Sequence, residues 1–226
     1  MAQHTQLQAA DGHKFDAYIA QPTGEPKAGI VVLQEIFGVN AHIRSVADGF
    51  AQAGYLAIAP ALFDRAQRDV ELDYNSETMQ QGIQLVQKLK LDQTLEDIDA
   101  AIQYLRDHGA RKVGVVGYCW GGTLAWVSNT RLHPDATVSY YGGGIQNHIK
   151  EKPTCPAMFH FGLLDTHIPQ TVVKQVRHEY PNFSVFTYEA GHAFNRSGNA
   201  SYNEPAAKLA LQRTLAHFNE HLVTTR

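Results

Sequence analysis

The sequence predicts an α/β protein with a mostly parallel central sheet that is flanked by helices on both faces. Short β-rich apolar runs alternate with longer segments of helical periodicity along the whole chain, and this alternation is typical of βαβ crossover units. No tract rich in Pro, Gly or Ser divides the chain, and no internal repeat is found. For 226 residues, these observations favour a single domain over residues 1–226.

The predicted strands are of two kinds. Residues 14–20 alternate apolar and polar side chains, as in an antiparallel edge strand. The others are nearly continuous apolar runs, as in a parallel sheet that is buried on both faces. These runs cover residues 28–34, 55–59, 112–117, 136–141, 157–161 and 183–188.

Apolar residues repeat every three or four positions in two segments, which predicts amphipathic helices. The first segment has Asp92 as a possible N-cap and Gly109 after its end. Its apolar residues are Leu95, Ile98, Ile102 and Leu105. Those of the C-terminal segment are Leu211, Leu215, Phe218 and Leu222. Less regular helical patterns cover residues 42–53, 76–90, 121–131 and 169–179. Because ligands of such sheets bind outside the carboxyl ends of the strands, the loops after the strands are where a site is expected.

Composition excludes several classes of protein. Apolar residues make up 44% and charged residues 18% of the chain, as in an ordinary globular domain. The 19 basic and 22 acidic residues give a net charge of -3, which argues against a nucleic-acid binder. Residues 1–5 carry no secretion signal, and no apolar run approaches the ~20 residues that span a bilayer. We therefore expect a cytoplasmic protein without membrane or nucleic-acid partners.

Cys119 has the spacing of a nucleophile elbow. It follows a predicted strand, precedes a predicted helix, and has Gly117 two residues before it and Gly121 two residues after it. A sharp strand-to-helix turn leaves no room for side chains at its neighbours, and the helix N-terminus favours a thiolate. The alternatives are a buried structural cysteine or a dinucleotide loop, although the G-x-G-x-x-G pattern is missing.

An elbow nucleophile needs an acid and then a histidine after later strands. Asp165 follows the strand over 157–161, and His192 follows the strand over 183–188. His192 is the predicted base, and Asp165 is predicted to orient its ring. Asp165 is alternatively a helix N-cap ahead of Pro169, and His192 is alternatively a structural histidine. His160 and His167 are competitors, but they lie within a strand and at a helix start.

The segment Gln34–Asn40 follows the first buried strand. Glu35 would be partly desolvated there, which suits proton transfer, although a surface glutamate in an ordinary loop is the simpler interpretation. The amides of Ile36 and of Trp120, directly after the nucleophile, are candidate oxyanion donors.

Four blocks of the sequence together resemble the dienelactone hydrolase (carboxymethylenebutenolidase) family. They are Gln34-Glu-Ile-Phe-Gly-Val-Asn-Ala41, Gly117-Tyr-Cys-Trp-Gly-Gly122, Tyr140-Tyr-Gly142 and Gly191-His-Ala-Phe-Asn-Arg196. The resemblance covers nearly the whole chain. It implies an α/β-hydrolase fold and hydrolysis of a small lactone or ester through a cysteine acyl-enzyme. We expect no cofactor, and a monomer or small homo-oligomer.

The resemblance also implies roles for individual residues. It maps Cys119, Asp165 and His192 onto the triad of the family, and the amides of Ile36 and Trp120 onto its oxyanion hole. It gives Glu35 the task of holding the resting thiol until substrate binding lets it take the proton. Arg196 matches an arginine that holds the substrate carboxylate. Phe37 and Tyr141, in two of the matching blocks, are the other expected substrate-binding residues.

The chain departs from the family pattern at two points. Lactone-cleaving members carry a further substrate-binding arginine after the third strand, whereas residues 71–90 contain none and only Arg65 and Arg68 lie nearby. Trp120 also replaces a smaller aliphatic residue. A broader carboxylesterase or thioesterase is therefore an alternative, and a non-catalytic ligand-binding module of the same fold is another. No metal site is expected, since Cys119 and Cys155 show no paired ligand spacing.

Overall fold

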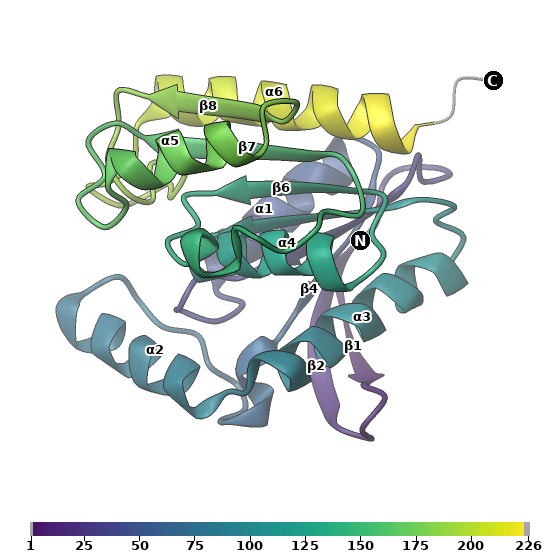
Figure 1. Ribbon diagram of the computed structural model, residues 1–226. Coiled ribbons are helices and arrows are strands. Elements are labelled where there is room, and N and C mark those ends of the chain that lie inside the picture. Colours follow the sequence, from purple (N-terminus) through teal and green to yellow (C-terminus); the bar gives the residue numbers. More distant parts are fainter. Residues whose placement is uncertain (1, 224–226) are drawn as a thin grey trace. The chain divides into compact units, whose positions relative to one another are not determined.

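The computed structural model describes residues 2–223. Residue 1 and residues 224–226, the two ends of the predicted single domain, lie outside it. The chain divides into two compact units, Met1–Gly114 and Val115–Arg226, and each has its own strands and helices (Figure 1). One domain over residues 1–226 stays a prediction. Among the described residues, no helix combines the length and the apolar character that crossing a bilayer requires.

The first unit contains four strands in the order β1-β2-β4-β3. They are β1 (Ala2–Gln8), β2 (Lys14–Ala20), β3 (Gly29–Leu33) and β4 (Leu56–Pro60). β2 is antiparallel to β1 and to β4, whereas β3 and β4 are parallel. The antiparallel direction of residues 14–20 is confirmed, but their edge position is wrong because β1 pairs with β2 along its whole length. β1 escapes prediction because its residues are mostly polar.

The helical elements of this unit are α1 (Ala41–Gln52), the 3-10 turn η1 (Leu62–Arg65), α2 (Ser76–Lys88) and α3 (Leu91–Asp107). In Figure 1, α1 lies behind the strands of this unit and α3 lies in front of them. The apolar residues predicted to face the core from α3 are buried. The predicted N-cap Asp92 is wrong. Lys90 is the N-cap of α3, and Asp92 lies in the first turn, where its charge is favourable to the helix dipole.

The second unit contains four strands in the order β5-β6-β7-β8. They are β5 (Val113–Tyr118), which begins at the end of the first unit, β6 (Ala136–Tyr140), β7 (Ala157–Gly162) and β8 (Ser184–Tyr188). β6, β7 and β8 pair in parallel. The helical elements are α4 (Trp120–Arg131), the 3-10 turn η2 (Ile145–His148), α5 (Gln170–Glu179) and α6 (Glu204–Leu222).

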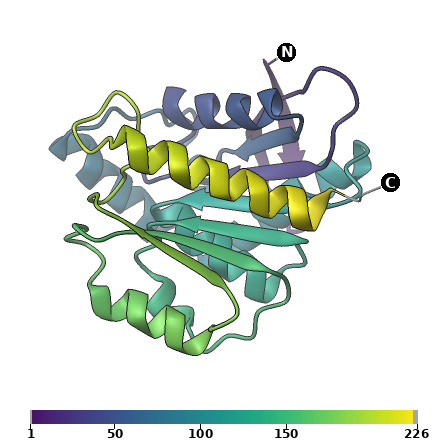
Figure 2. The same ribbon diagram turned by 90° about the horizontal axis from the view of Figure 1, so that it is seen from above.

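Neighbouring residues of β7 show that helices cover both faces of this part of the sheet. The Phe159 ring packs on Trp126 of α4, with 5.4 Å between centroids. The next side chain, His160, points to the other face and reaches Thr214 of α6. Figure 2 shows α6 lying across the strands of this unit. The α/β prediction is thus confirmed.

Two of the four apolar residues predicted for α6, Leu211 and Leu215, lie outside its buried stripe. Leu211 is 42% exposed, because the buried stripe of the helix lies on the neighbouring positions. Its members are Ala206, Ala207, Ala210, Thr214, His217, Phe218 and Leu222. The stripe includes Thr214 and His217, two polar residues that an apolar pattern does not select.

Candidate active site

Cys119 lies at the sharp turn between β5 and α4. Its backbone has φ 55° and ψ −114°, a left-handed conformation that is unfavourable for a residue with a side chain. Its N–H donates to Tyr140 O at 3.0 Å, and its carbonyl oxygen accepts from Gly122 N at 2.9 Å. A β-carbon on Gly117 would lie 1.8 Å from Gly121 O. The glycine before the cysteine is therefore required by the close approach of the chain.

Asp165 and His192 meet Cys119 at the carboxyl ends of the second unit's strands. Asp165 follows β7, and His192 follows β8. His192 Nδ1 lies 2.7 Å from Asp165 Oδ2, and His192 Nε2 lies 3.1 Å from Cys119 Sγ. The structure thus brings together three residues that are 46 and 27 positions apart in the chain.

The second oxygen of Asp165 stabilises the loop that carries it. Asp165 Oδ1 accepts from the amides of His167 and Ile168, at 2.8 and 3.1 Å. The alternative of an N-cap is only partly right, because the N-cap of α5 is Pro169. One carboxylate therefore both stabilises its own turn and contacts His192.

The attraction between Asp165 and His192 shifts the pKa of both residues. Burial lowers the pKa of His192, but the hydrogen bond that the ring donates to Asp165 and the proximity of Cys119 outweigh it and raise the pKa to about 10. Burial alone would raise the pKa of Asp165. The hydrogen bonds that its carboxylate accepts from His192 and from the two loop amides outweigh burial, so the pKa is lowered. The Asp165 side chain is completely buried, where a hydrogen-bonded ion pair is screened little by solvent.

The two competing histidines have other surroundings. His160 is completely buried, and it bonds the Tyr188 hydroxyl at 2.8 Å and Thr214 Oγ1 at 3.1 Å. Burial lowers its pKa to about 3, so it stays neutral. His167 is exposed, and its ring stands nearly perpendicular to that of His192 with 5.0 Å between centroids.

Tyr141, Trp120 and Arg196 also belong to the second unit. Tyr141 follows β6 with φ 38°, and its buried ring packs 5.1 Å from the His192 ring. Trp120 is the first residue of α4. Arg196 is 9% exposed, in the loop after His192, and its amide donates to Ala193 O. Sequence reasoning missed one neighbour, Phe194, whose ring packs against Tyr141 at 5.3 Å.

Glu35, Ile36 and Phe37 belong to the first unit, directly after β3. Glu35 is completely buried, so the alternative of a surface glutamate is wrong. The ring of Phe37 is buried and packs edge-on against Tyr74 at 4.8 Å. Helix α2 lies against the same loop. A β-carbon on Gly82 would be 2.0 Å from Ile36 O.

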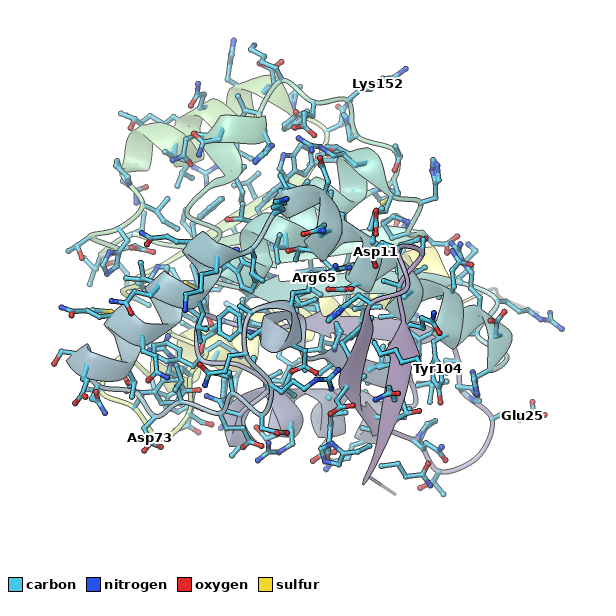
Figure 3. The ribbon with its side chains drawn as sticks, turned by 90° about the horizontal axis from the view of Figure 1, so that it is seen from below. Asp11, Glu25, Arg65, Asp73, Tyr104 and Lys152 are labelled. Atoms are coloured by element: carbon cyan, nitrogen blue, oxygen red, sulfur yellow. The ribbon has the colours of Figure 1, made fainter. Side chains whose placement is uncertain are left out.

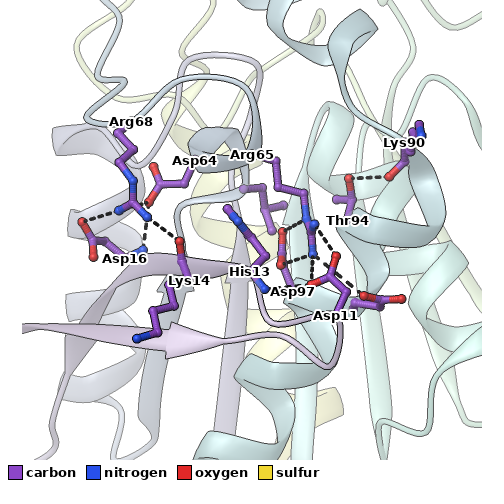
Figure 4. A network of polar contacts seen from close by, with 12 residues as sticks. Asp11, His13, Lys14, Asp16, Asp64, Arg65, Arg68, Lys90, Thr94 and Asp97 are labelled. Carbon is purple, nitrogen blue, oxygen red and sulfur yellow. Dashed lines mark hydrogen bonds and ion pairs between the residues drawn. The ribbon is translucent and has the colours of Figure 1, made fainter.

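The two arginines nearest to the arginine-free segment are held in ion pairs. Arg65 reaches Asp97 with Nε at 2.7 Å and Asp11 with Nη1 at 2.7 Å. Figure 3 shows Arg65 beside Asp11, and Figure 4 shows the dashed contacts that surround both. Arg65 holds the pKa of Asp11 down at about 2, whereas burial raises that of Asp97 to about 6. Arg68 lies 3.8 Å from both Asp16 and Asp64.

Possible metal ligands are not grouped in the part of the chain that the structure describes. Within residues 2–223, no three His, Cys, Asp or Glu side chains are arranged so that they could hold an ion.

Comparisons with known proteins show the family of the chain. The model of the dienelactone hydrolase family matches residues 15–222. The chain is 36% identical to a carboxymethylenebutenolidase of Pseudomonas putida over 92% of each chain. It is 31% identical to carboxymethylenebutenolidase 1 of Cupriavidus pinatubonensis over 93% of each. The crystal structure of a putative dienelactone hydrolase from Klebsiella pneumoniae superimposes with a TM-score of 0.85 at 30% identity, covering 97% of this chain and 99% of that one.

These matches extend over nearly the whole chain and include the segments that carry the elbow, the acid and the histidine. They confirm the α/β-hydrolase fold, and they support an enzyme over a non-catalytic ligand-binding module. The chain belongs to the dienelactone hydrolase family and is a hydrolase of the lactone and ester class.

Proposed function

We propose that this enzyme cleaves a small lactone or ester through a covalent thioester at Cys119, with His192 and Asp165 completing a catalytic triad. The observation that carries the proposal is the continuous row of contacts from Asp165 Oδ2 to His192 Nδ1 and from His192 Nε2 to Cys119 Sγ, at 2.7 and 3.1 Å. The raised pKa of His192 and the lowered pKa of Asp165 support an imidazolium paired with a carboxylate.

In the first half of the reaction the sulfur of Cys119 attacks the carbonyl carbon of the substrate. An Sγ–C bond forms, and the carbonyl oxygen becomes an oxyanion, for which the family resemblance assigns the amides of Ile36 and Trp120 as donors. When the carbonyl re-forms, the bond to the leaving oxygen breaks. That oxygen departs as an enolate or an alkoxide and takes up the proton of His192, which leaves the ring neutral. In a lactone it stays attached to the acyl chain.

In the second half His192 acts as a base toward water. The neutral ring takes a proton from water, and the resulting hydroxide attacks the thioester carbonyl. The Sγ–C bond then breaks, which releases the carboxylic acid and returns the sulfur to its starting state. Asp165 fixes the ring so that Nε2 faces the sulfur and stabilises the imidazolium in both halves.

The remaining predicted residues enter through the family resemblance. Glu35 is assigned the proton exchange that activates the resting thiol, and its complete burial supports a role other than that of a surface charge. Arg196 is assigned to the substrate carboxylate, and Phe37 and Tyr141 are assigned to the walls of the substrate site.

The experiment compares the two cysteines of the chain. Cys119→Ala is expected to lower kcat/KM for dienelactone and for p-nitrophenyl acetate by about 10³-fold or more, with an unchanged circular dichroism spectrum. Cys155→Ala is the matched control, because this thiol is bonded by the Asn129 amide and burial raises its pKa to about 12. In His192→Gln, mass spectrometry is expected to detect an acyl group on Cys119. Retained turnover in Cys119→Ala contradicts the proposal.

A second candidate is a carboxylesterase or thioesterase of broader scope by the same mechanism. The observation that favours it is the engagement of Arg65 and Arg68 in ion pairs, together with the absence of arginine from residues 71–90. Relative kcat/KM for an anionic lactone and for neutral esters separates the two candidates.

A further inference from the structure

An exposed histidine, His167, packs against the ring of His192. The two ring centroids are 5.0 Å apart, and the ring planes stand at 72° to each other. His192 has a second ring neighbour, Tyr141, at 5.1 Å, and this residue is completely buried. Solvent therefore reaches one ring neighbour of His192, which is His167, whereas the other is enclosed by the protein.

The backbone fixes the place of this exposed ring. Asp165 Oδ1 accepts from the amides of His167 and Ile168, at 2.8 and 3.1 Å. Ile168 is buried, and it directly precedes Pro169, the N-cap of α5. The other carboxylate oxygen, Asp165 Oδ2, lies 2.7 Å from His192 Nδ1. One carboxylate thus holds the backbone of one histidine and the ring of the other.

An ionisable ring is an unusual neighbour for His192, because His192 is itself charged. Burial opposes this charge, but Asp165 and Cys119 outweigh burial and raise the pKa of His192 to about 10. The first turn of α5, which follows the Asp165 loop, carries no charged side chain. A neutral imidazole beside His192 leaves its charge undisturbed, whereas a second imidazolium at this distance repels it. Histidine is the side chain whose charge ordinarily changes between about pH 5 and pH 8, so this contact is sensitive to acid in a way that a phenylalanine contact is not.

We propose that His167 is a positioning residue of the reaction, whose neutral ring covers the charged His192 and whose protonated ring repels that charge and slows the attack by Cys119. This inference rests on the proposed function, since it takes His192 and Cys119 to be the reacting pair. When His167 takes up a proton from solvent, His192 passes its Nε2 proton to Cys119 Sγ, 3.1 Å away. The two rings together then carry one positive charge, as before. The sulfur has become a neutral thiol, which is a poor nucleophile.

The first test compares wild type with His167→Phe, which keeps a flat ring but cannot take up a proton. We measure kcat/KM for p-nitrophenyl acetate from pH 5 to pH 8 and express it for each enzyme relative to its own value at pH 8. Two unit charges 5 Å apart near the surface change an equilibrium by about fivefold. Wild type is therefore expected to lose about fivefold more activity by pH 5 than His167→Phe. The control is His178→Phe at an exposed histidine of α5, which is expected to keep the wild-type profile.

The second test makes the charge permanent. His167→Lys places a cation beside His192 at every pH of the assay, and His167→Met is the matched variant of similar length without charge. The pKa of His192, measured by NMR, is expected to fall from about 10 to about 9 in the lysine variant and to stay in place in the methionine variant. At pH 8, kcat/KM is expected to be about fivefold lower with lysine than with methionine. A side chain that only stabilises the loop would not move the titration of His192.

The outcomes separate this proposal from the one on which it rests. Turnover that depends on Cys119 but has the same acid profile in wild type and in His167→Phe overturns the role of His167 and leaves the triad intact. An unmoved titration of His192 in His167→Lys, or an equal change of profile in His178→Phe, does the same. Turnover that survives Cys119→Ala overturns both proposals.

Discussion

Two polar clusters in the second unit, the proposed triad and a network at α6, each contain a histidine with two hydrogen-bond partners, yet they differ in charge. His192 is partly exposed and His160 is buried. In the triad, His192 lies between a carboxylate and a thiol, and its pKa is raised to about 10. In the α6 network, defined by His160, Thr214, Tyr140 and Tyr188, the ring bonds only hydroxyl groups. The pKa of His160 is lowered to about 3 by its complete burial.

The difference shows how a neighbouring carboxylate changes the charge of an imidazole. Both rings are removed from most of the solvent, which disfavours the charged form. Only His192 has a carboxylate that offsets this cost, and only His192 lies after a strand, where a neighbouring loop can bring a nucleophile to it. His160 lies within β7 and is surrounded by side chains of α6 and β8. Burial alone therefore gives a neutral, structural histidine, whereas the carboxylate gives the charged ring that the proposed mechanism requires.

The largest expected effect comes from removing that carboxylate. Asp165→Asn keeps the shape of the side chain but loses its charge, so His192 is no longer held as an imidazolium with Nε2 toward the sulfur. We expect kcat/KM to fall by about 10³- to 10⁴-fold, and the pKa of His192, measured by NMR, to fall toward that of a free histidine.

The matching change in the α6 network is Tyr188→Phe, which removes the hydroxyl bonded to His160 Nδ1. This variant is expected to retain kcat/KM close to that of wild type. A loss as large as that of Asp165→Asn would show that the two histidines are not distinct in role.

The second effect is on stability. His160→Ala removes two buried hydrogen bonds and leaves a cavity between β7 and α6, so we expect a loss of about 2–4 kcal/mol in the free energy of unfolding. Urea denaturation measures this loss, and turnover per folded molecule is expected to persist. The exposed His178 of α5 gives the control, because His178→Ala is expected to change stability by less than about 0.5 kcal/mol. A folded but inactive His160→Ala protein would contradict the structural role.

The contrast between the clusters also explains what the sequence could predict. The position of Cys119 follows from glycines two residues away on either side, and Asp165 and His192 follow from their places after strands. These are local features that a single chain displays. The strand over residues 2–8 has no such local feature. Its residues are mostly polar, and they form a strand by pairing with residues 14–20.

Contacts between distant residues could not be predicted. His160 meets Thr214, which is 54 positions away, and Arg65 meets Asp11, which is also 54 positions away. The contact of Gly82 with Ile36 crosses a comparable gap. Nothing in the local pattern marks these partners, because hydrogen bonding and close packing depend on the fold that brings the segments together. For this reason the sequence predicted the residues of the proposed triad but not the engagement of Arg65.

The smallest effect is the dependence of the free energy of unfolding on pH. This single measurement compares both histidines. The pKa of His192 is raised above the unfolded value of about 6.5, so its stabilising contribution is complete below that pH and is lost as the pH rises through about 10. The pKa of His160 is lowered. Its contribution is therefore present above pH ~6.5 and is lost as the pH falls toward about 3, because the unfolded chain takes up a proton there.

Each histidine changes the slope of the unfolding free energy against pH by at most about 1.4 kcal/mol per pH unit. The comparison is therefore made between variants, by urea unfolding from pH 4 to pH 10. Asp165→Asn is expected to flatten the alkaline side of the profile. His160→Ala is expected to flatten the acid side, where His217 also contributes because burial lowers its pKa to about 4. If both variants flattened the same side, the opposite charge states of the two rings would be wrong. Since each substitution changes only one of the two clusters, the two sides of the profile then report the two histidines separately.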